Sequence, residues 1–192
     1  MSETPSQPSA KQRKGLNVWV ILAFTGVMLI LVLIGLRLIN NDATPVRLGV
    51  QPKDFSLINF EGGVINTEDL RGQVVLINFW ASWCTTCDAE AALLERAWQQ
   101  YQEETGDQVA FLGVAYMDTE NAAKAYVGDH GVTFPNGQDL RGEISRIYQV
   151  KSVPETFILD ADGVLRSRKI GPFSSVDEIL TAVDGVVNHL KN

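Results

Sequence analysis

The stretch from residue 74 to residue 94, VVLINFWASWCTTCDAEAALL, constrains the fold more than any other part of the chain. Its β-branched and aromatic run Val74–Trp80 predicts a buried strand, and a helical pattern begins near the first cysteine of the Cys-x-x-Cys pair. Cys84 is therefore expected in an exposed turn at the amino end of a helix, where unpaired N–H groups and the helix dipole favour a thiolate. Cys87 follows about one turn later, so the two sulfurs can exchange two electrons as a disulfide.

These are the only two cysteines among 192 residues. A disulfide across two intervening residues closes too short a loop to stabilise a domain much, so a redox pair is the better interpretation. Half of a zinc site is the alternative, but such sites usually have four ligands, and neither His130 nor His189 lies near a second Cys-x-x-Cys-like ligand pair. We therefore expect no metal and no cofactor besides the Cys84–Cys87 disulfide.

A long apolar stretch near the amino terminus predicts a membrane anchor. Leu16–Leu36 contains 21 residues without a charge. At roughly 1.5 Å per residue a helix of that length spans about 30 Å, the thickness of the hydrocarbon core of a bilayer. We assign the anchor to residues 16–39. A buried core helix would normally be shorter, and a cleaved signal peptide is the main alternative, although no A-x-A-like site follows.

The basic residues around this stretch predict its orientation. Three precede it and one follows it: Lys11, Arg13, Lys14 and Arg37. Under the positive-inside rule, residues 1–15 form a cytoplasmic tail and everything after the anchor lies on the extracytoplasmic or periplasmic side of the cell membrane. Residues 40–52 predict a tether to a domain over residues 53–192. From residue 41 onward the chain carries 12 basic and 22 acidic residues, so we expect no nucleic-acid partner.

Beyond the tether, hydrophobic patterns alternate between strands and helices. The expected elements are a hairpin over residues 54–66, a helical turn at 67–70, strands at 74–80 and 109–116, helices from about 84 to 105 and 119 to 130, an extended segment at 134–135, a helix at 142–148, strands at 156–159 and 164–170, and a helix from 174 or 175 to about 190. This order predicts an α/β fold, a mixed β-sheet with helices on both faces.

Two motifs together resemble a known family. Trp83-Cys84-Thr-Thr-Cys87 and, about seventy residues later, Val153-Pro154-Glu155-Thr-Phe resemble the membrane-anchored thioredoxin-like proteins of the TlpA, ResA and CcmG (DsbE) group. The resemblance covers residues 52–190. The Pro-Glu sequence at residues 154–155 resembles that of the CcmG branch. It implies a thiol–disulfide oxidoreductase that supplies reductant to apocytochrome c, and a transmembrane electron donor that recharges the pair.

The exchange chemistry and the resemblance together assign chemical roles. Cys84 is the attacking sulfur and Cys87 the resolving one, because exchange passes through a mixed disulfide. Glu90 matches a carboxylate that this group keeps beside its thiols, where it could carry a proton during resolution. Spacing alone favours an ordinary glutamate on the helix surface, and the resemblance reverses that preference.

Further residues are expected to contact the substrate. Pro154 matches a proline that precedes a strand in cis and faces the cysteines, so the Val153 backbone would pair with an extended client segment. Glu155 would line the same groove, or else be a solvated glutamate at the strand end. Trp83, directly before Cys84, is expected to contact substrate as well.

Three residues depart from the pattern of relatives. Asn78 occupies the place of an aspartate buried in thioredoxin, although asparagine is usual in the anchored group, and Ala92 replaces a proline that kinks the helix in many relatives. Asp88 replaces a basic residue and follows Cys84 by four positions. Its negative charge predicts a pKa of Cys84 above the roughly 7 typical of thioredoxin.

Two alternative functions remain open from the sequence. One is a general disulfide exchange protein or oxidant that serves other exported clients. The other is a copper-carrying binding module of thioredoxin-like type. Such carriers resemble this chain in fold and anchor but use Cys-x-x-x-Cys with a distal histidine, whereas this chain has two residues between its cysteines.

Overall fold

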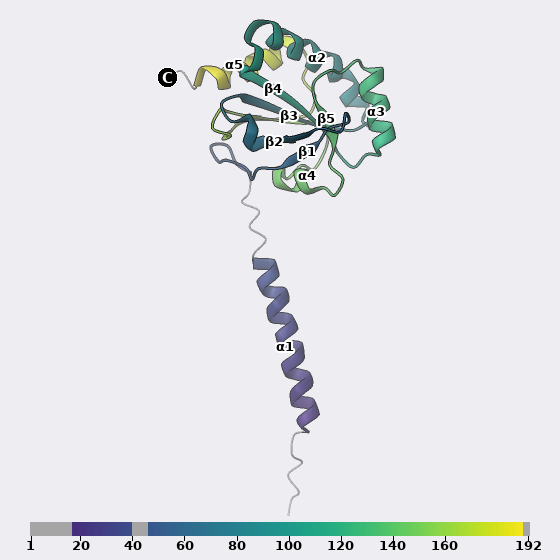
Figure 1. Ribbon diagram of the computed structural model, residues 1–192, viewed down its shortest axis with the longest axis vertical. Coiled ribbons are helices and arrows are strands. Elements are labelled where there is room, and N and C mark those ends of the chain that lie inside the picture. The colour runs from purple at the N-terminus through teal and green to yellow at the C-terminus, as the bar shows by residue number, and fades with distance from the viewer. Residues whose placement is uncertain (1–16, 40–45, 190–192) are drawn as a thin grey trace, which may run out of the picture. The chain divides into compact units, whose positions relative to one another are not determined.

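The computed structural model describes residues 17–39 and 46–189, which belong to two separate units. The first unit contains one helix, α1 (Val18–Ile39), shown in Figure 1. Its Val18–Leu36 portion is long and apolar enough to cross a membrane, in agreement with the predicted anchor. The predicted tail at residues 1–15 and the first part of the tether lie outside the described residues.

The second unit is built on a five-stranded sheet with the order β5-β4-β3-β6-β7. Its strands are β3 (Val74–Trp80), β4 (Val109–Ala115), β5 (Asn136–Gln138), β6 (Glu155–Leu159) and β7 (Leu165–Ile170). The central strand β3 runs parallel to β4 and antiparallel to β6. All seven residues of β3 are buried, because both faces of the sheet are covered. The predicted mixed sheet is confirmed.

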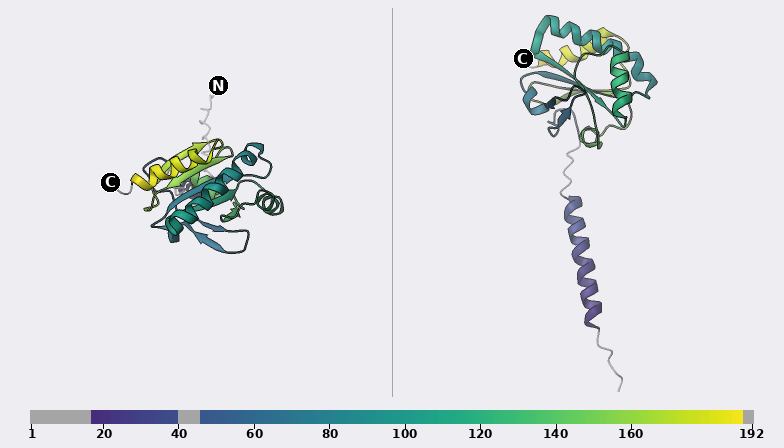
Figure 2. Two further views of the ribbon diagram at one scale, coloured as in Figure 1. Left: turned by 90° about the horizontal axis from the view of Figure 1, so that it is seen from above. Right: turned by 45° about the vertical axis from the view of Figure 1, so that its right-hand side comes forward.

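Different elements cover the two faces of the sheet, as Figures 1 and 2 show. The long helices α2 (Thr85–Thr105) and α5 (Val176–His189) pack on one face, where Leu94 and Ile179 meet Leu76 of β3. The hairpin of β1 (Ser56–Ile58) and β2 (Val64–Asn66), followed by the 3-10 turn at Thr67–Leu70, covers the other face together with α4 (Glu143–Tyr148). A further helix, α3 (Glu120–Asp129), packs beside α2.

The hydrophobic pattern of the sequence did not predict one of the strands. The segment Asn136–Gln138 forms β5, parallel to β4, where we expected only an extended stretch at residues 134–135. Its Asn-Gly-Gln sequence has no apolar alternation, so hydrophobic periodicity could not reveal it. Gly113 of β4 permits the close approach, since a Cβ there would lie 1.6 Å from the Asn136 side-chain oxygen. Most other predicted boundaries differ from the observed ones by one or two residues.

Candidate active site

The cysteine pair lies where the central strand gives way to α2. Cys84 is the residue that caps the amino end of the helix, and Cys84 and Cys87 form a disulfide with their Cα atoms 5.3 Å apart. The backbone N–H of Cys87 donates to Sγ of Cys84 at 3.2 Å. After reduction, the same amide and the helix dipole would stabilise negative charge on this sulfur. The predicted placement of Cys84 at a helix amino end is confirmed.

Both cysteines are more enclosed than the sequence predicts. Cys84 is 6 % exposed and Cys87 is 1 % exposed, so Cys84 remains the more accessible of the two. The carbonyl oxygen of Val153 lies 3.6 Å from Sγ of Cys84, and Trp80 and Tyr126 belong to the buried cluster around the pair. Of the two sulfurs, only that of Cys84 is therefore open to approach from solvent.

Side chains after β4 hold the loop that presents the cysteines. The carboxylate of Asp118 accepts hydrogen bonds from the backbone N–H of Ser82 at 2.6 Å and from its hydroxyl at 2.9 Å. The indole N–H of Trp83 donates to the carbonyl of Met117 at 3.2 Å, while the Trp83 side chain remains 60 % exposed. Trp83 thus offers an apolar surface directly beside Cys84. No sequence signal pointed to Asp118.

The loop before β6 faces the cysteines. The peptide bond between Val153 and Pro154 is cis, as the resemblance implied, and the Val153 carbonyl points toward Cys84. Within the part of the chain that the structure describes, the backbone N–H of Val153 has no hydrogen-bond partner. An unpaired N–H beside the reactive sulfur can donate a hydrogen bond to a carbonyl of an extended peptide.

Glu90 is buried behind the cysteines, on the face of the sheet covered by α2. Its side chain is 1 % exposed, which excludes the alternative of a surface glutamate. Its carboxylate accepts hydrogen bonds from the Asn78 side chain at 2.8 Å and from the backbone N–H of Phe173 at 2.9 Å. Burial raises the pKa of Glu90 to about 7, although both hydrogen bonds oppose that shift. Cys87 and Glu90 line the same cavity of about 10 Å³, roughly the room of one water molecule.

Asn78 connects this carboxylate to the sheet. Its amide donates both to Glu90 and, at 3.0 Å, to the hydroxyl of Thr156 on β6. The sequence indicated that Asn78 replaces an aspartate, but not that it would bind Glu90. Asn78 is neutral, whereas an aspartate at this position would place a second carboxylate beside Glu90. The negative charge of Glu90 is therefore not opposed by a charge at position 78.

Glu155 does not line an open groove. It is 1 % exposed and pairs with Nε of Arg168 on the neighbouring strand β7 at 2.5 Å. It lies opposite Phe79 in the pairing of β3 with β6, on the face away from Glu90. The Arg168 guanidinium also lies over the ring of Phe157, 5.4 Å from its centroid. Both readings from the sequence, a groove residue and a solvated strand end, assumed an exposed side chain and are wrong.

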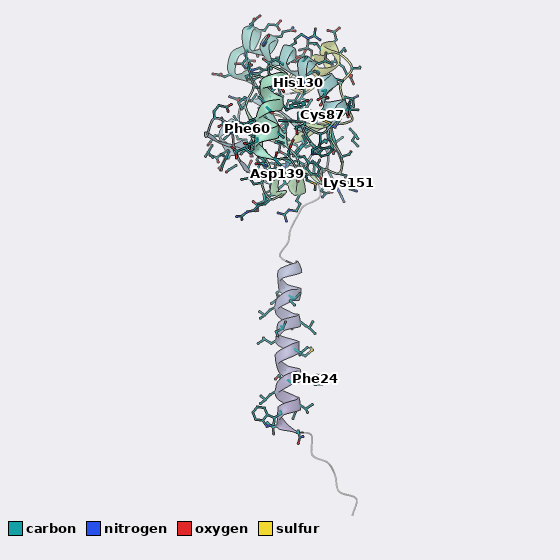
Figure 3. The ribbon with its side chains drawn as sticks, turned by 90° about the vertical axis from the view of Figure 1, so that its right-hand side faces the viewer. Phe24, Phe60, Cys87, His130, Asp139 and Lys151 are labelled. Atoms are coloured by element: carbon teal, nitrogen blue, oxygen red, sulfur yellow. A yellow bond between two sulfur atoms is a disulfide. The ribbon has the colours of Figure 1, made fainter. Side chains whose placement is uncertain are left out.

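Asp88 has a partner that the sequence did not indicate. Its carboxylate oxygen lies 3.6 Å from Nε2 of His130, at the end of α3. Nδ1 of His130 lies 2.9 Å from the carbonyl of Tyr126, which fixes the orientation of the ring beside Asp88. Figure 3 labels His130 and Cys87 on neighbouring parts of the domain. The imidazole of His130 is therefore a neighbour of the carboxylate that stands one helical turn from Cys84.

Comparisons with known proteins agree with this site. The profile of the AhpC/TSA family matches residues 48–168. The chain belongs to the AhpC/TSA family. Within the family, it is 35 % identical over 129 residues to the thioredoxin-like protein YneN of Bacillus subtilis, covering 66 % of this chain and 73 % of YneN. It is 29 % identical over 130 residues to the thiol-disulfide oxidoreductase ResA of Bacillus thuringiensis, covering 68 % and 73 %.

A solved structure is similar over the same domain. It is a secreted Mycobacterium tuberculosis disulfide oxidoreductase homologous to E. coli DsbE, with a TM-score of 0.61 and 26 % identity, covering 68 % of this chain and 95 % of that one. The thioredoxin-like fold is confirmed. This AhpC/TSA protein is a thiol–disulfide oxidoreductase of the ResA and DsbE type, whose reactive group is the Cys84–Cys87 pair. Its assignment to the CcmG branch stays a prediction.

Proposed function

We propose that this protein is a membrane-tethered reductant of disulfides in exported proteins, with apocytochrome c as its client. The observation that carries the proposal is the placement of Cys84 at the amino end of α2, facing the Val153 carbonyl. A sulfur in that position is stabilised as a thiolate by the helix, and an extended client segment can pair beside it.

The reduction follows from the two sulfurs. The Cys84 thiolate attacks one sulfur of the client disulfide, whose S–S bond breaks and whose second sulfur leaves as a thiolate and takes a proton. Cys87 then loses its proton and attacks the Cys84 sulfur of the mixed disulfide, which releases the first client sulfur. Two electrons have passed to the client, and the protein is left with the Cys84–Cys87 disulfide. A transmembrane electron donor must reduce it before the next cycle.

Glu90 supports the second step. Resolution requires a base for the Cys87 thiol, and Glu90 lines the same small cavity. Because its pKa is about 7, its carboxylate can accept and return a proton near neutral pH. Its two hydrogen-bond partners are both donors, so the charged form is already oriented to accept.

The extracytoplasmic location rests on the anchor and its charges. Three basic residues precede the apolar span and one follows it. This bias favours a cytoplasmic amino terminus and a domain on the opposite side of the membrane. Fusion of a periplasmic-type reporter after residue 192 should be active, whereas activity of only a cytoplasmic reporter would overturn the orientation.

Trapping of the client tests the proposal. The variant Cys87→Ser cannot resolve a mixed disulfide, so it should accumulate covalent complexes with its client through Cys84. The matched control Cys84→Ser should capture none. Mass spectrometry of the captured proteins should find chains with a haem-binding Cys-x-x-Cys-His motif.

A general exchange protein is the competing function, and one observation favours it. Glu155, whose Pro-Glu step suggested the CcmG branch, is buried and paired with Arg168, so it offers no surface to a particular client. If the trap captures several exported proteins and none with Cys-x-x-Cys-His, the apocytochrome client is wrong. A measured reduction potential near −120 mV, instead of near the −270 mV of thioredoxin, would contradict the reducing direction.

A further inference from the structure

A groove of about 750 Å³ borders the redox site. One side comes from the segment Tyr116–Asp118 after β4, and the other from α4 and residues 149–151. The groove meets the site at two points. The Met117 carbonyl accepts the hydrogen bond of Trp83, and Lys151 lies two residues before Val153, whose carbonyl faces Cys84. A client held by its disulfide at Cys84 would have a neighbouring segment within reach of this groove.

The groove is basic. Arg141, Arg146 and Lys151 line it with exposed side chains, and in the described residues none of them lies within 4.0 Å of a carboxylate. Two acids also line it and keep their negative charge, so the lining carries three positive and two negative charges; Asp139 accepts from amides at the start of α4, and Asp118 from the loop before Trp83. The Arg146 guanidinium already donates to the backbone carbonyls of Gly142 and Arg141, but its charge, like those of Arg141 and Lys151, meets no carboxylate within ion-pair distance among the described residues.

This concentration of cations contrasts with the rest of the domain, which is acidic overall. Eleven basic side chains lie between residues 46 and 189, and five of these form ion pairs. Three of the remaining six line the groove. The other three are Arg47, Lys53 and Arg96, which line none of the groove. Glu120 and Glu143 line an adjoining hollow that shares Arg141 and Leu140 with the groove.

The groove also has apolar walls. Met117 is 73 % exposed and Leu140 is 71 % exposed, and both line it. Of the two, Met117 also lies beside the redox site, since its carbonyl accepts from the indole of Trp83. Figure 3 labels Asp139 and Lys151 on the part of the domain drawn below Cys87. A surface with both characters suits a peptide that carries acidic and apolar side chains.

We propose that this groove binds an acidic segment that flanks the disulfide of the client. The inference rests on the proposed function for its biological meaning, but the binding itself does not need the redox chemistry. Three solvent-exposed charge contacts together should favour an acidic segment over a neutral one by about tenfold at low salt. The preference should fall as ionic strength rises.

The test uses reduced full-length protein in detergent and synthetic peptides with one internal disulfide followed by a short run of Asp, Asn or Lys. Wild-type protein should reduce the Asp peptide about ten times faster than the Asn peptide, and the Lys peptide more slowly still. Substitution of Arg141, Arg146 and Lys151 together with glutamine should remove this preference while the rate for the Asn peptide stays unchanged.

The matched control carries the same number of glutamine substitutions at Arg47, Lys53 and Arg96, which are exposed and unpaired but lie elsewhere. It should retain the preference of the wild type. Loss of the preference in this control, or equal rates of wild type with Asp and Asn peptides, would overturn the proposal and leave the reducing function intact.

A second measurement separates the groove from the redox chemistry. A fluorescent, cysteine-free Asp peptide should bind the oxidised full-length protein, and the triple groove variant should bind it about ten times more weakly. If the protein reduced no peptide but still bound this one through the groove, the proposed function would fail and the binding site would stand. If the peptide did not bind, the binding site would fail.

Discussion

Replacement of Glu90 by glutamine should change how the stability of the domain depends on pH. Burial raises the pKa of Glu90 from 4.5 to about 7, so between these pH values the folded protein binds a proton that the unfolded chain has released. The stability of the wild type relative to Glu90→Gln must therefore fall as pH rises through that window, and level off above it. The change in the pKa of Glu90 from 4.5 to about 7 corresponds to about 3 kcal/mol of unfolding free energy.

Urea unfolding of the oxidised full-length protein in detergent, followed by tryptophan fluorescence at several pH values, measures this. Contributions from all other groups cancel in the difference between the wild type and the variant. Glu178→Gln is the matched control, because hydrogen bonds from Lys169 and Ser174 lower the pKa of Glu178 to about 2. Relative to Glu178→Gln, the wild type should lose stability as the pH falls below 4.5. A difference for Glu90→Gln that stays constant between pH 4.5 and 7 would refute the argument.

Three further substitutions have defined outcomes. Asp88→Asn should lower the pKa of the Cys84 thiol, because a negative charge near the thiolate is removed. Thiolate absorbance against pH measures this, and an unchanged or higher pKa would contradict the prediction. Gly113→Ala should destabilise the domain by about 2 kcal/mol or more in urea unfolding, because its Cβ overlaps a neighbouring side chain; a neutral effect would contradict the close approach. Arg168→Met should cost about 3 kcal/mol at neutral pH, and adding Glu155→Gln should restore much of the loss; no recovery would argue against the ion pair.

The parts of the fold that follow local patterns were predictable from the sequence. A local pattern of about twenty residues is enough to predict three elements: the buried strand β3, the helix that begins after Cys84, and the apolar helix α1. Helix boundaries followed from caps, as at Thr119, whose hydroxyl accepts from the backbone N–H of Ala122. The strand β5 escaped because its pairing depends on Gly113 and not on its own polar sequence.

The surroundings of the site were harder to predict, because they join residues far apart in the chain. Spacing along α2 put Glu90 on the side of Cys87, but its raised pKa follows from burial, and its carboxylate binds the Phe173 amide more than eighty residues later. The pairing of Asp88 with His130 likewise requires α3 to pack beside α2. The burial of Glu155 depends on Arg168 in the neighbouring strand. Such contacts are decided by tertiary packing, which periodicity does not encode.

The central claim is that Cys84 attacks and Cys87 resolves, and alkylation of the reduced full-length protein tests it most directly. Limited treatment with iodoacetamide at neutral pH, followed by peptide mass spectrometry, reports the rate at each sulfur. Cys84 should be modified first, because it caps the helix and is the more accessible residue, while Cys87 should react much more slowly. Faster modification of Cys87, or no reaction at Cys84, would contradict the assignment.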